Sequence, residues 1–173
     1  MDGVLADFPR QFLEDWKNKH PEEMFVPTDK HASPNLANDY PSHLRGQVKE
    51  IYRSPGFFSK LPPIPGGIEA VKEMIATGYD ISICTSPIMS YENCVLEKYK
   101  WIDKHLGRDV VRKIVMTRDK TLVRGDFLID DNPVIIGSCK PEWEHILFTQ
   151  PYNKDFPQRR IDNWNMWKEI LVR

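Results

Sequence analysis

Four short runs of apolar residues divide the chain, and each is rich in β-branched or aromatic side chains. Runs of this length and composition are typical of buried strands in a parallel sheet. They occupy residues 81–84, 114–116, 127–129 and 145–148.

Helical patterns lie between these runs. One helix is expected after Pro65-Gly66-Gly67 and before Gly78, because Ile68, Val71 and Ile75 recur at helical spacing. A second pattern before Gly107 aligns Val95, Tyr99, Ile102 and Leu106. Alternating strands and helices predict an α/β fold built on a doubly wound parallel sheet.

A further helix is expected to open with Phe8, Phe12 and Trp16, which are spaced four residues apart. The stretch that follows, residues 9–61, separates this opening from the next core strand. We therefore expect a small helical cap at 9–61, inserted into a core formed by 1–8 and 62–173.

Length and charge narrow the class of protein. A chain of 173 residues fits one compact domain with a modest insertion. With 24 basic against 25 acidic residues, the net charge of −1 gives no field that favours nucleic-acid polymers or acidic membranes. A small-molecule partner is expected.

The cysteines and the hydropathy indicate in which cellular compartment the protein is expected. Cys84, Cys94 and Cys139 have no metal-ligand spacing, which suits a reducing compartment and predicts a cytoplasmic protein. No apolar run approaches the roughly 18 residues of a membrane helix. A mitochondrial location stays open if a leader was lost upstream of Met1.

Candidate chemistry begins at the first residues. Residues 2–8 match the second half of a phosphoryl-transfer loop with the pattern Asp-x-Asp-Gly-Val-x-Ala-Asp-Phe. In that loop the first carboxylate attacks phosphorus, and the second protonates the leaving oxygen. Asp2 can fill only the second role, since Met1 stands at the intervening position. An ordinary turn is the alternative.

Three later segments follow in the order that haloacid-dehalogenase phosphatases require, namely Ile83–Pro87, Thr117–Thr121 and Leu128–Asp131. Together with Gly3–Phe8 and Trp143–Thr149 they make the chain similar to the cytosolic and mitochondrial 5'(3')-deoxyribonucleotidases. The resemblance runs from Asp2 to the last helix and is weakest between residues 28 and 40. It implies a Rossmann-like core of that superfamily.

The resemblance also implies roles for individual residues. Asp2 would be the general acid and base, with the nucleophilic aspartate expected just before Met1. Mg²⁺ would bind the backbone oxygen of Asp2 and the carboxylate of Asp130, and Asp131 would support them. Phosphate would contact Thr85, Ser86 and Lys120. The substrate would further contact Phe8, Tyr52, Phe58 and Arg118.

Each of these segments also has an ordinary structural interpretation. Thr85 and Ser86 could cap a helix, and Asp130-Asp131-Asn132-Pro133 could be a simple turn. A lysine in a charged loop is usually solvated, and aromatic residues at helical spacing usually belong to the core. The order of all the motifs favours the functional interpretation.

The loop at Asp2 normally follows the central strand of the sheet, which would then lie upstream of Met1. Inner sheet edges without it would leave backbone groups unpaired, at about 1–3 kcal/mol each. We therefore expect the polypeptide to continue upstream with an apolar strand that ends in aspartate.

The expected function is a Mg²⁺-dependent phosphatase that hydrolyses pyrimidine deoxyribonucleoside 5'- or 3'-monophosphates, such as dUMP and dTMP, through an aspartyl-phosphate. One alternative is a related phosphatase with another phosphomonoester substrate. Another is a nucleotide-binding form that lacks its nucleophile. The resemblance also implies a homodimer.

Overall fold

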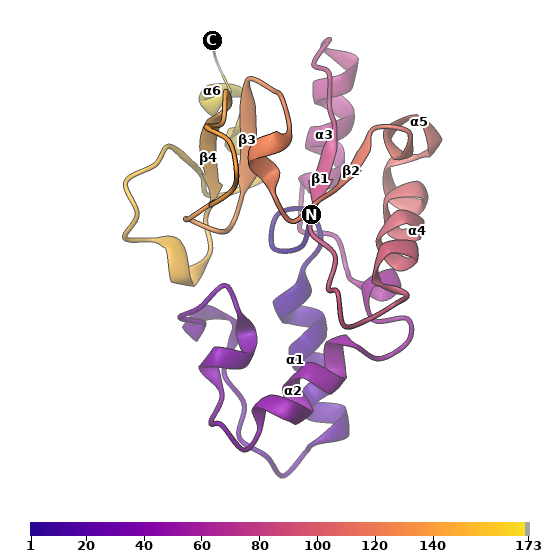
Figure 1. The fold of residues 1–173 in the computed structure, drawn as a ribbon, viewed down its shortest axis with the longest axis vertical. Helices are drawn as coiled ribbons and strands as arrows, with labels where there is room; N and C mark the ends of the chain where they lie inside the picture. The colour runs from indigo at the N-terminus through magenta and orange to yellow at the C-terminus, as the bar shows by residue number, and fades with distance from the viewer. Residues whose placement is uncertain (172–173) are drawn as a thin grey trace.

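The computed structural model describes residues 1–171, so the last two residues of the predicted core, 172 and 173, lie outside the described part. Figure 1 shows two parts. Strands and helices of the α/β core surround the N-terminus, and a helical segment, residues 8–60, lies below it.

The helical segment is built from two α-helices and three 3₁₀ turns. These are α1 (Phe8–Lys19), η1 (Thr28–Lys30), η2 (Leu36–Asp39), α2 (Arg45–Tyr52) and η3 (Phe58–Lys60). Helix α1 begins where the Asp7 carboxylate accepts a hydrogen bond from the N–H of Arg10 at 3.2 Å. Phe12, Trp16 and Tyr40 pack ring against ring, so the segment has a buried aromatic core of its own.

The core mixes helices and strands along the chain, as the sequence predicted, although α5 follows α4 directly and β4 follows β3 directly. Its first half holds α3 (Gly67–Ala76), β1 (Ile83–Thr85), α4 (Cys94–Leu106), α5 (Arg108–Val111) and β2 (Ile114–Met116). Its second half holds η4 (Lys120–Leu122), β3 (Phe127–Asp130), β4 (Glu144–Phe148), η5 (Pro151–Asn153), β5 (Arg160–Ile161), η6 (Trp164–Met166) and α6 (Trp167–Ile170). All strand pairings are parallel.

The strands form two sheets, whereas the sequence analysis predicted one. β1 pairs with β2 in register Ile83 to Ile114, and β3, β4 and β5 form the other sheet. β1 and β3 do not pair with each other. Between them lies a cavity of about 150 Å³, lined by apolar side chains of both strands and of the N-terminal loop. The α/β class with parallel strands is confirmed, and the single continuous sheet is not.

The buried faces of two helices differ from those expected. Ile75 on α3 is 43% exposed and Val95 on α4 is 46% exposed, while Met74 is buried. α4 instead buries Glu97 and Lys98, because both side chains have polar partners inside the protein. Hydrophobic periodicity ignores such partners. On α4 the prediction is wrong at Val95, whereas Ile102 is buried and Tyr99 and Leu106 pack against the core as expected.

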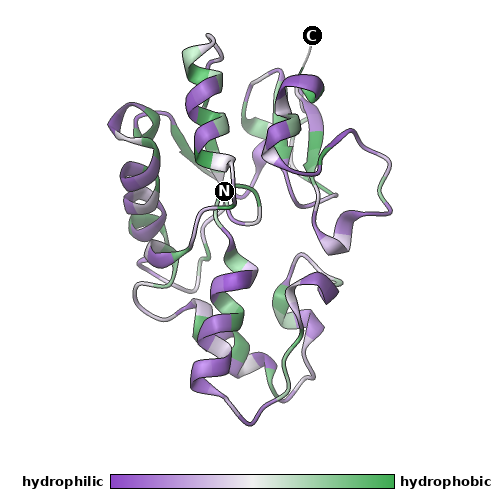
Figure 2. Ribbon diagram, turned by 180° about the vertical axis from the view of Figure 1, so that it is seen from behind, coloured by the Kyte–Doolittle hydropathy of each residue, from purple (hydrophilic) through white to green (hydrophobic). Residues whose placement is uncertain are grey.

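Hydropathy follows this packing. Figure 2 shows helices that are hydrophobic on one side and hydrophilic on the other, around predominantly hydrophobic strands. Among residues 1–171, every helix is too short or too polar to cross a lipid bilayer.

Candidate active site between the core and the helical segment

The N-terminal residues form a tight loop that presents Asp2. The carbonyl oxygen of Met1 accepts hydrogen bonds from the N–H groups of Val4, Leu5 and Ala6 at 2.8–3.2 Å. The indole N–H of Trp164 donates to the carbonyl of Val4 at 2.9 Å, which ties the loop to the end of the core.

Gly3 allows this loop to approach Asp131. Its φ of +69° lies in the left-handed region, and a Cβ placed there would stand 2.8 Å from the Asp131 carboxylate. The side-chain amide of Gln150 donates to the Gly3 carbonyl at 2.7 Å. The loop is therefore locked against residues that lie about 130 and 150 positions later in the chain.

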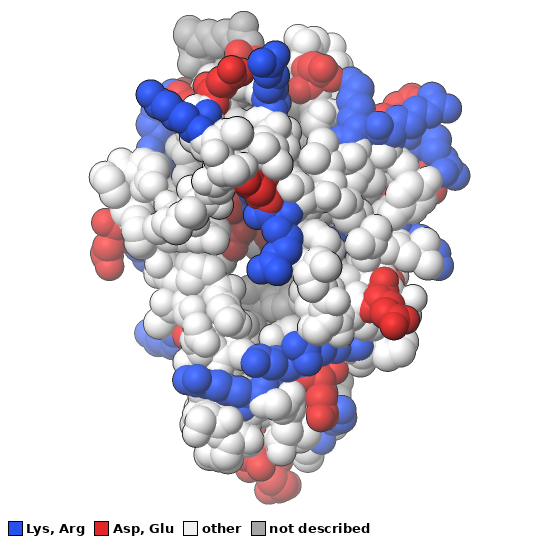
Figure 3. All heavy atoms as spheres, in the orientation of Figure 1, with Lys and Arg blue, Asp and Glu red and all other residues white. Residues whose placement is uncertain are grey.

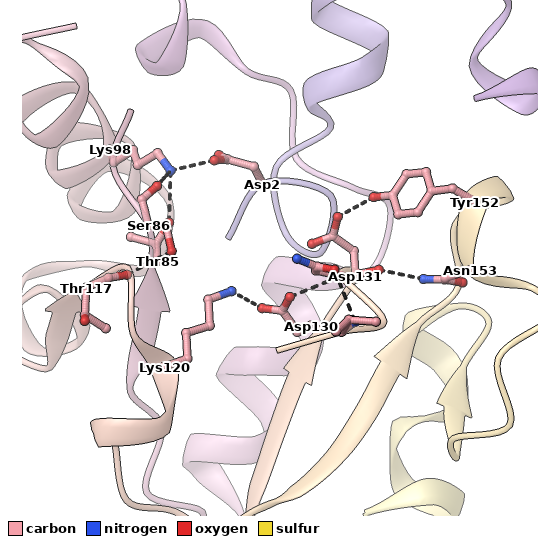
Figure 4. A network of polar contacts seen from close by, with 12 residues as sticks. Asp2, Thr85, Ser86, Lys98, Thr117, Lys120, Asp130, Asp131, Tyr152 and Asn153 are labelled. Carbon is pink, nitrogen blue, oxygen red and sulfur yellow. Dashed lines mark hydrogen bonds and ion pairs between the residues drawn. The ribbon is translucent and has the colours of Figure 1, made fainter. Parts of the chain in front are cut away.

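A buried lysine connects Asp2 with the end of β1 (Figure 4). The Nζ atom of Lys98, on α4, donates to Asp2 Oδ2 at 2.6 Å, to Thr85 Oγ1 at 3.0 Å and to the Ser86 carbonyl at 2.7 Å. Only 1% of the Lys98 side chain is exposed. Its ammonium thus has three partners, and it holds one oxygen of the Asp2 carboxylate in place.

Lys120 and Asp130 form a second buried ion pair. Asp130 ends β3, and its other oxygen accepts the N–H of Asn132 at 3.0 Å. Burial by itself lowers the pKa of the Lys120 ammonium, but the neighbouring Asp130 carboxylate outweighs this effect and the pKa is raised. Lys120 therefore carries a positive charge into the site.

Asp131 is held by residues that follow β4. The phenol of Tyr152 donates to its carboxylate, and the Asn153 amide donates to its carbonyl at 2.8 Å. Burial and the Asp130 charge raise the pKa of the Asp131 carboxyl to about 6. Burial and the Asp131 charge raise the pKa of the Tyr152 phenol as well.

These groups line one cavity of about 270 Å³ between the core and the helical segment. Figure 3 shows this hollow in the middle of the molecule, with acidic and basic side chains at its edge. Its core side holds six residues predicted from the sequence, which are Asp2, Thr85, Ser86, Lys120, Asp130 and Asp131. The opposite side includes Phe8, His31, Ser33 and Leu36.

Of the four residues predicted to contact the substrate, Phe8 lines the cavity, whereas Tyr52, Phe58 and Arg118 do not. The Phe8 ring lines the cavity, and the rings of Tyr52 and Phe58 pack against it with centroids 5.7 and 6.1 Å away. Arg118 is exposed and stands outside the wall. Tyr52 and Phe58 therefore support Phe8, and direct contact of these residues with substrate stays a prediction.

Glu97 links α4 to the segment that carries Phe58. Its two carboxylate oxygens accept the N–H groups of Gly56 at 2.8 Å and Phe58 at 2.9 Å, and the Tyr91 phenol donates to the same group. Glu97 and Lys98 are neighbours, so one turn of α4 anchors both the aromatic side and the Asp2 side of the site.

The oxygen donors of the cavity suit Mg²⁺. Within residues 1–171, no group of three or more His, Cys, Asp or Glu side chains is arranged to hold a metal ion. The cavity does combine two adjacent carboxylates at the end of β3 with Asp2, whose Oδ1 atom is buried without a partner. Hard oxygen donors in small number are the usual environment of Mg²⁺, which keeps several waters.

Sequence reasoning missed four residues of this site, namely His31, Lys98, Tyr152 and Asn153. Lys98 sits in an ordinary charged helical pattern, and only its burial distinguishes it. His31 lies in the stretch where the resemblance is weakest. No local signal singles out either residue.

The comparisons with known proteins bear on the family of the chain. The family model "5' nucleotidase, deoxy (Pyrimidine), cytosolic type C protein" matches residues 1–173. A Bordetella pertussis protein, provisionally named a 5'(3')-deoxyribonucleotidase, is 48% identical over 99% of this chain and 92% of its own.

Two human proteins are each 42% identical over 99% of this chain. They are the cytosolic type of 5'(3')-deoxyribonucleotidase, covered over 90% of its length, and the mitochondrial enzyme, covered over 79%. Because the family model spans the whole chain and these relatives align over nearly all of it, the chain belongs to the family of deoxy (pyrimidine) 5' nucleotidases of cytosolic type C, which are phosphomonoester hydrolases.

Proposed function

We propose that this protein is a Mg²⁺-dependent phosphatase that hydrolyses pyrimidine deoxyribonucleoside 5'- or 3'-monophosphates such as dUMP and dTMP. The observation that carries the proposal is the convergence of Asp2, Asp130 and Lys120 on one cavity. Asp2 comes from the N-terminal loop and Lys120 and Asp130 come from the region around β3, and they meet the Thr85 and Ser86 hydroxyls there.

The phosphate group would bind at the core side of the cavity. Lys120 supplies a positive charge that is anchored by Asp130, and the Thr85 hydroxyl is oriented by Lys98. The Ser86 hydroxyl donates to the Thr117 carbonyl at 2.8 Å, so it would have to exchange this bond in order to donate to a phosphate oxygen. Fixed donors such as Lys120 stabilise a phosphoryl group without reorganisation during the reaction.

Asp2 would transfer the protons. Lys98 occupies its Oδ2 atom, while its Oδ1 atom has no partner within residues 1–171. A carboxyl group fixed on one oxygen and free on the other can give a proton to the leaving oxygen and later take one from water. Asp131, supported by Tyr152, would hold the Gly3 turn in position beside Asp2.

Asp130 and the backbone oxygen of Asp2 would hold Mg²⁺. When bound, the ion neutralises charge on the phosphate oxygens and positions the phosphate. The nucleophile of this scheme would be an aspartate, which would form the aspartyl-phosphate.

The helical segment is proposed to act as the cap that covers the nucleoside. Phe8 offers a flat apolar surface in the cavity wall, backed by Tyr52 and Phe58. A pyrimidine ring stacks well on such a surface.

A cytoplasmic homodimer is the assembly proposed with this function. Leu122, Val134 and Ile136 are 61%, 52% and 83% exposed, and bonds from Ser138 to Asp119 hold their two loops together. Sedimentation equilibrium would test this, and a monomeric mass at micromolar concentration would exclude the homodimer.

The decisive experiment measures phosphate release from dUMP and dTMP with and without Mg²⁺, using protein of known intact mass. Release that requires Mg²⁺ and exceeds that from sugar phosphates supports the proposal. Equal rates on nucleotides and sugar phosphates would favour another phosphomonoester as substrate. Nucleotide binding without any release would identify the non-catalytic form.

A further inference from the structure

A buried histidine and aspartate form a pair in the helical segment, at the side of the cavity opposite the phosphate-binding groups. The Nδ1 atom of His31 and the Oδ2 atom of Asp39 are 2.8 Å apart. Their side chains are only 3% and 7% exposed. The other Asp39 oxygen accepts the N–H of Ala32 at 3.3 Å, so the carboxylate is fixed from two directions.

The second ring nitrogen of His31 has no hydrogen-bond partner in the part of the chain that the structure describes. Its Nε2 atom is buried and makes no hydrogen bond in the described structure. His20 and His145 also have an unpartnered Nε2, but only His31 of the three lines the cavity. A buried polar atom without a partner is unfavourable, and the cavity gives His31 a place where a ligand could supply one.

The pairing with Asp39 determines whether the Nε2 atom of His31 donates or accepts a hydrogen bond. An ionised carboxylate only accepts hydrogen bonds, so the Nδ1 position of the ring carries the hydrogen. In the neutral imidazole the Nε2 atom is then left with a lone pair, and it acts as an acceptor. The ligand group that suits it is an N–H.

The shape of the cavity indicates which ligand could carry this N–H. Lys120 and Thr85 lie at the core side, Phe8 lines the wall, and His31 belongs to the helical segment. A ligand that satisfies all three features has a phosphate at one end, a flat ring in the middle and an N–H on the edge of that ring. Uracil and thymine nucleotides have this combination, with the N–H at N3.

We infer that His31, oriented by Asp39, determines specificity by accepting a hydrogen bond from the N3–H of a uracil or thymine base. This inference rests on the proposed function, because it names the part of the substrate that the helical segment would recognise. A merely structural His31–Asp39 pair would stabilise the 31–39 loop without distinguishing one base from another.

The test compares three ligands in binding titrations with Mg²⁺ present. They are dUMP, its N3-methyl derivative, which lacks the N–H, and 2-deoxyribose 5-phosphate, which lacks the base. The proteins are wild type, His31→Phe, which keeps a ring of similar size, and Asp39→Asn. His20→Phe is the matched control, since His20 has the same unpartnered atom away from the cavity.

The expected result is a loss of about tenfold in dUMP affinity for His31→Phe, the usual effect of losing one buried hydrogen bond. The wild-type preference for dUMP over its N3-methyl derivative should shrink to nearly one in this variant. Asp39→Asn should show a smaller shift in the same direction, and His20→Phe should keep the wild-type preference. If circular dichroism shows that His31→Phe does not fold, the Asp39→Asn variant is used for the same comparison.

Two outcomes would overturn the inference. One is wild-type protein that binds dUMP and its N3-methyl derivative equally. The other is a His31→Phe variant whose affinity falls by the same factor for all three ligands. Because binding is measured separately from turnover, base discrimination without phosphate release would reject the proposed phosphatase and retain the role of His31. Phosphate release by the wild type, together with a His31→Phe variant that keeps the wild-type base preference, would retain the proposed phosphatase and reject the role of His31.

Discussion

The two sides of the cavity are organised differently. On the core side, each charged group is paired with a group from another part of the chain, as Lys98 is with Asp2 and Lys120 with Asp130. On the side of the helical segment, the cavity wall is mainly apolar and includes one buried polar atom without a partner, His31 Nε2.

This difference follows from what each side would recognise. A phosphate group carries charge that changes during reaction, so the groups around it must be fixed in advance by their neighbours. A base is neutral and flat, and one free acceptor beside an aromatic ring is enough to distinguish bases. The core side also keeps one oxygen, Asp2 Oδ1, without a partner among the described residues, and this is the atom proposed to transfer protons. An unpaired atom on either side therefore marks a group that is available to the substrate.

The largest expected loss of activity comes from the core-side variant Asp2→Asn. The amide keeps the size of the side chain but cannot transfer the proton, so kcat should fall by about 10²–10⁴-fold. Asp7→Asn in the same loop is the control, because asparagine caps a helix as well as aspartate does. Steady-state kinetics measure both, and an active Asp2→Asn variant would remove Asp2 from its proposed role.

The second variant is Lys98→Met, which keeps the length of the side chain and removes its charge. Without the ammonium, one oxygen of Asp2 loses its partner, and we expect a fall in kcat of about 10-fold or more with a smaller change in KM. The free energy of unfolding should fall by about 1–3 kcal/mol, since Asp2 keeps part of its hydration.

Lys100→Met is its control, because Lys100 is exposed on the same helix. Urea unfolding and kinetics together separate the two effects of Lys98. A Lys98→Met variant that is less stable but has the wild-type kcat would show that Lys98 acts only in folding.

The third variant, Gly3→Ala, tests how closely the loop must approach Asp131. Alanine at φ +69° is strained, and its Cβ would collide with the Asp131 carboxylate. We expect a loss of at least about 2 kcal/mol in unfolding free energy. Gly46→Ala is the matched control, because nothing lies within 4 Å of a Cβ there. Equal urea midpoints for the two variants would contradict this account.

The smallest expected effect concerns Asp131 and pH. Its pKa is raised from 3.8 to about 6 in the folded protein, so its burial favours the protonated form. Its contribution to stability is therefore present below pH 3.8 and is lost as pH rises towards 6. Relative to Asp131→Asn, the wild type should lose unfolding free energy across this window.

The variant Tyr152→Phe tests the cause of the shifted pKa of Asp131. The Tyr152 hydrogen bond lowers the pKa of Asp131, so its removal should raise that pKa further. The carboxyl carbon shift of Asp131, followed by NMR over pH 3–8, would report it. A lowered pKa in this variant would contradict the assigned contact.

Residue patterns were enough to predict most local elements and the core side of the cavity. Short β-branched runs gave the positions of β1 to β4, because a buried strand needs only a few apolar residues in succession. Thr85, Lys120 and Asp130 each follow or end such a run. Since carboxyl ends of parallel strands lie at one edge, their meeting in one cavity could be expected.

The division into two sheets, the burial of Glu97 and Lys98 on α4, and the roles of Lys98 and His31 depend on tertiary contacts. Lys98 and Asp2 are 96 positions apart, and the burial of that lysine depends on a partner that no local pattern reveals. His31 likewise lines the cavity and is distinguished by a buried ring nitrogen that has no partner among the described residues. Pairing and burial are properties of groups brought together by folding, so periodicity along the chain cannot contain them.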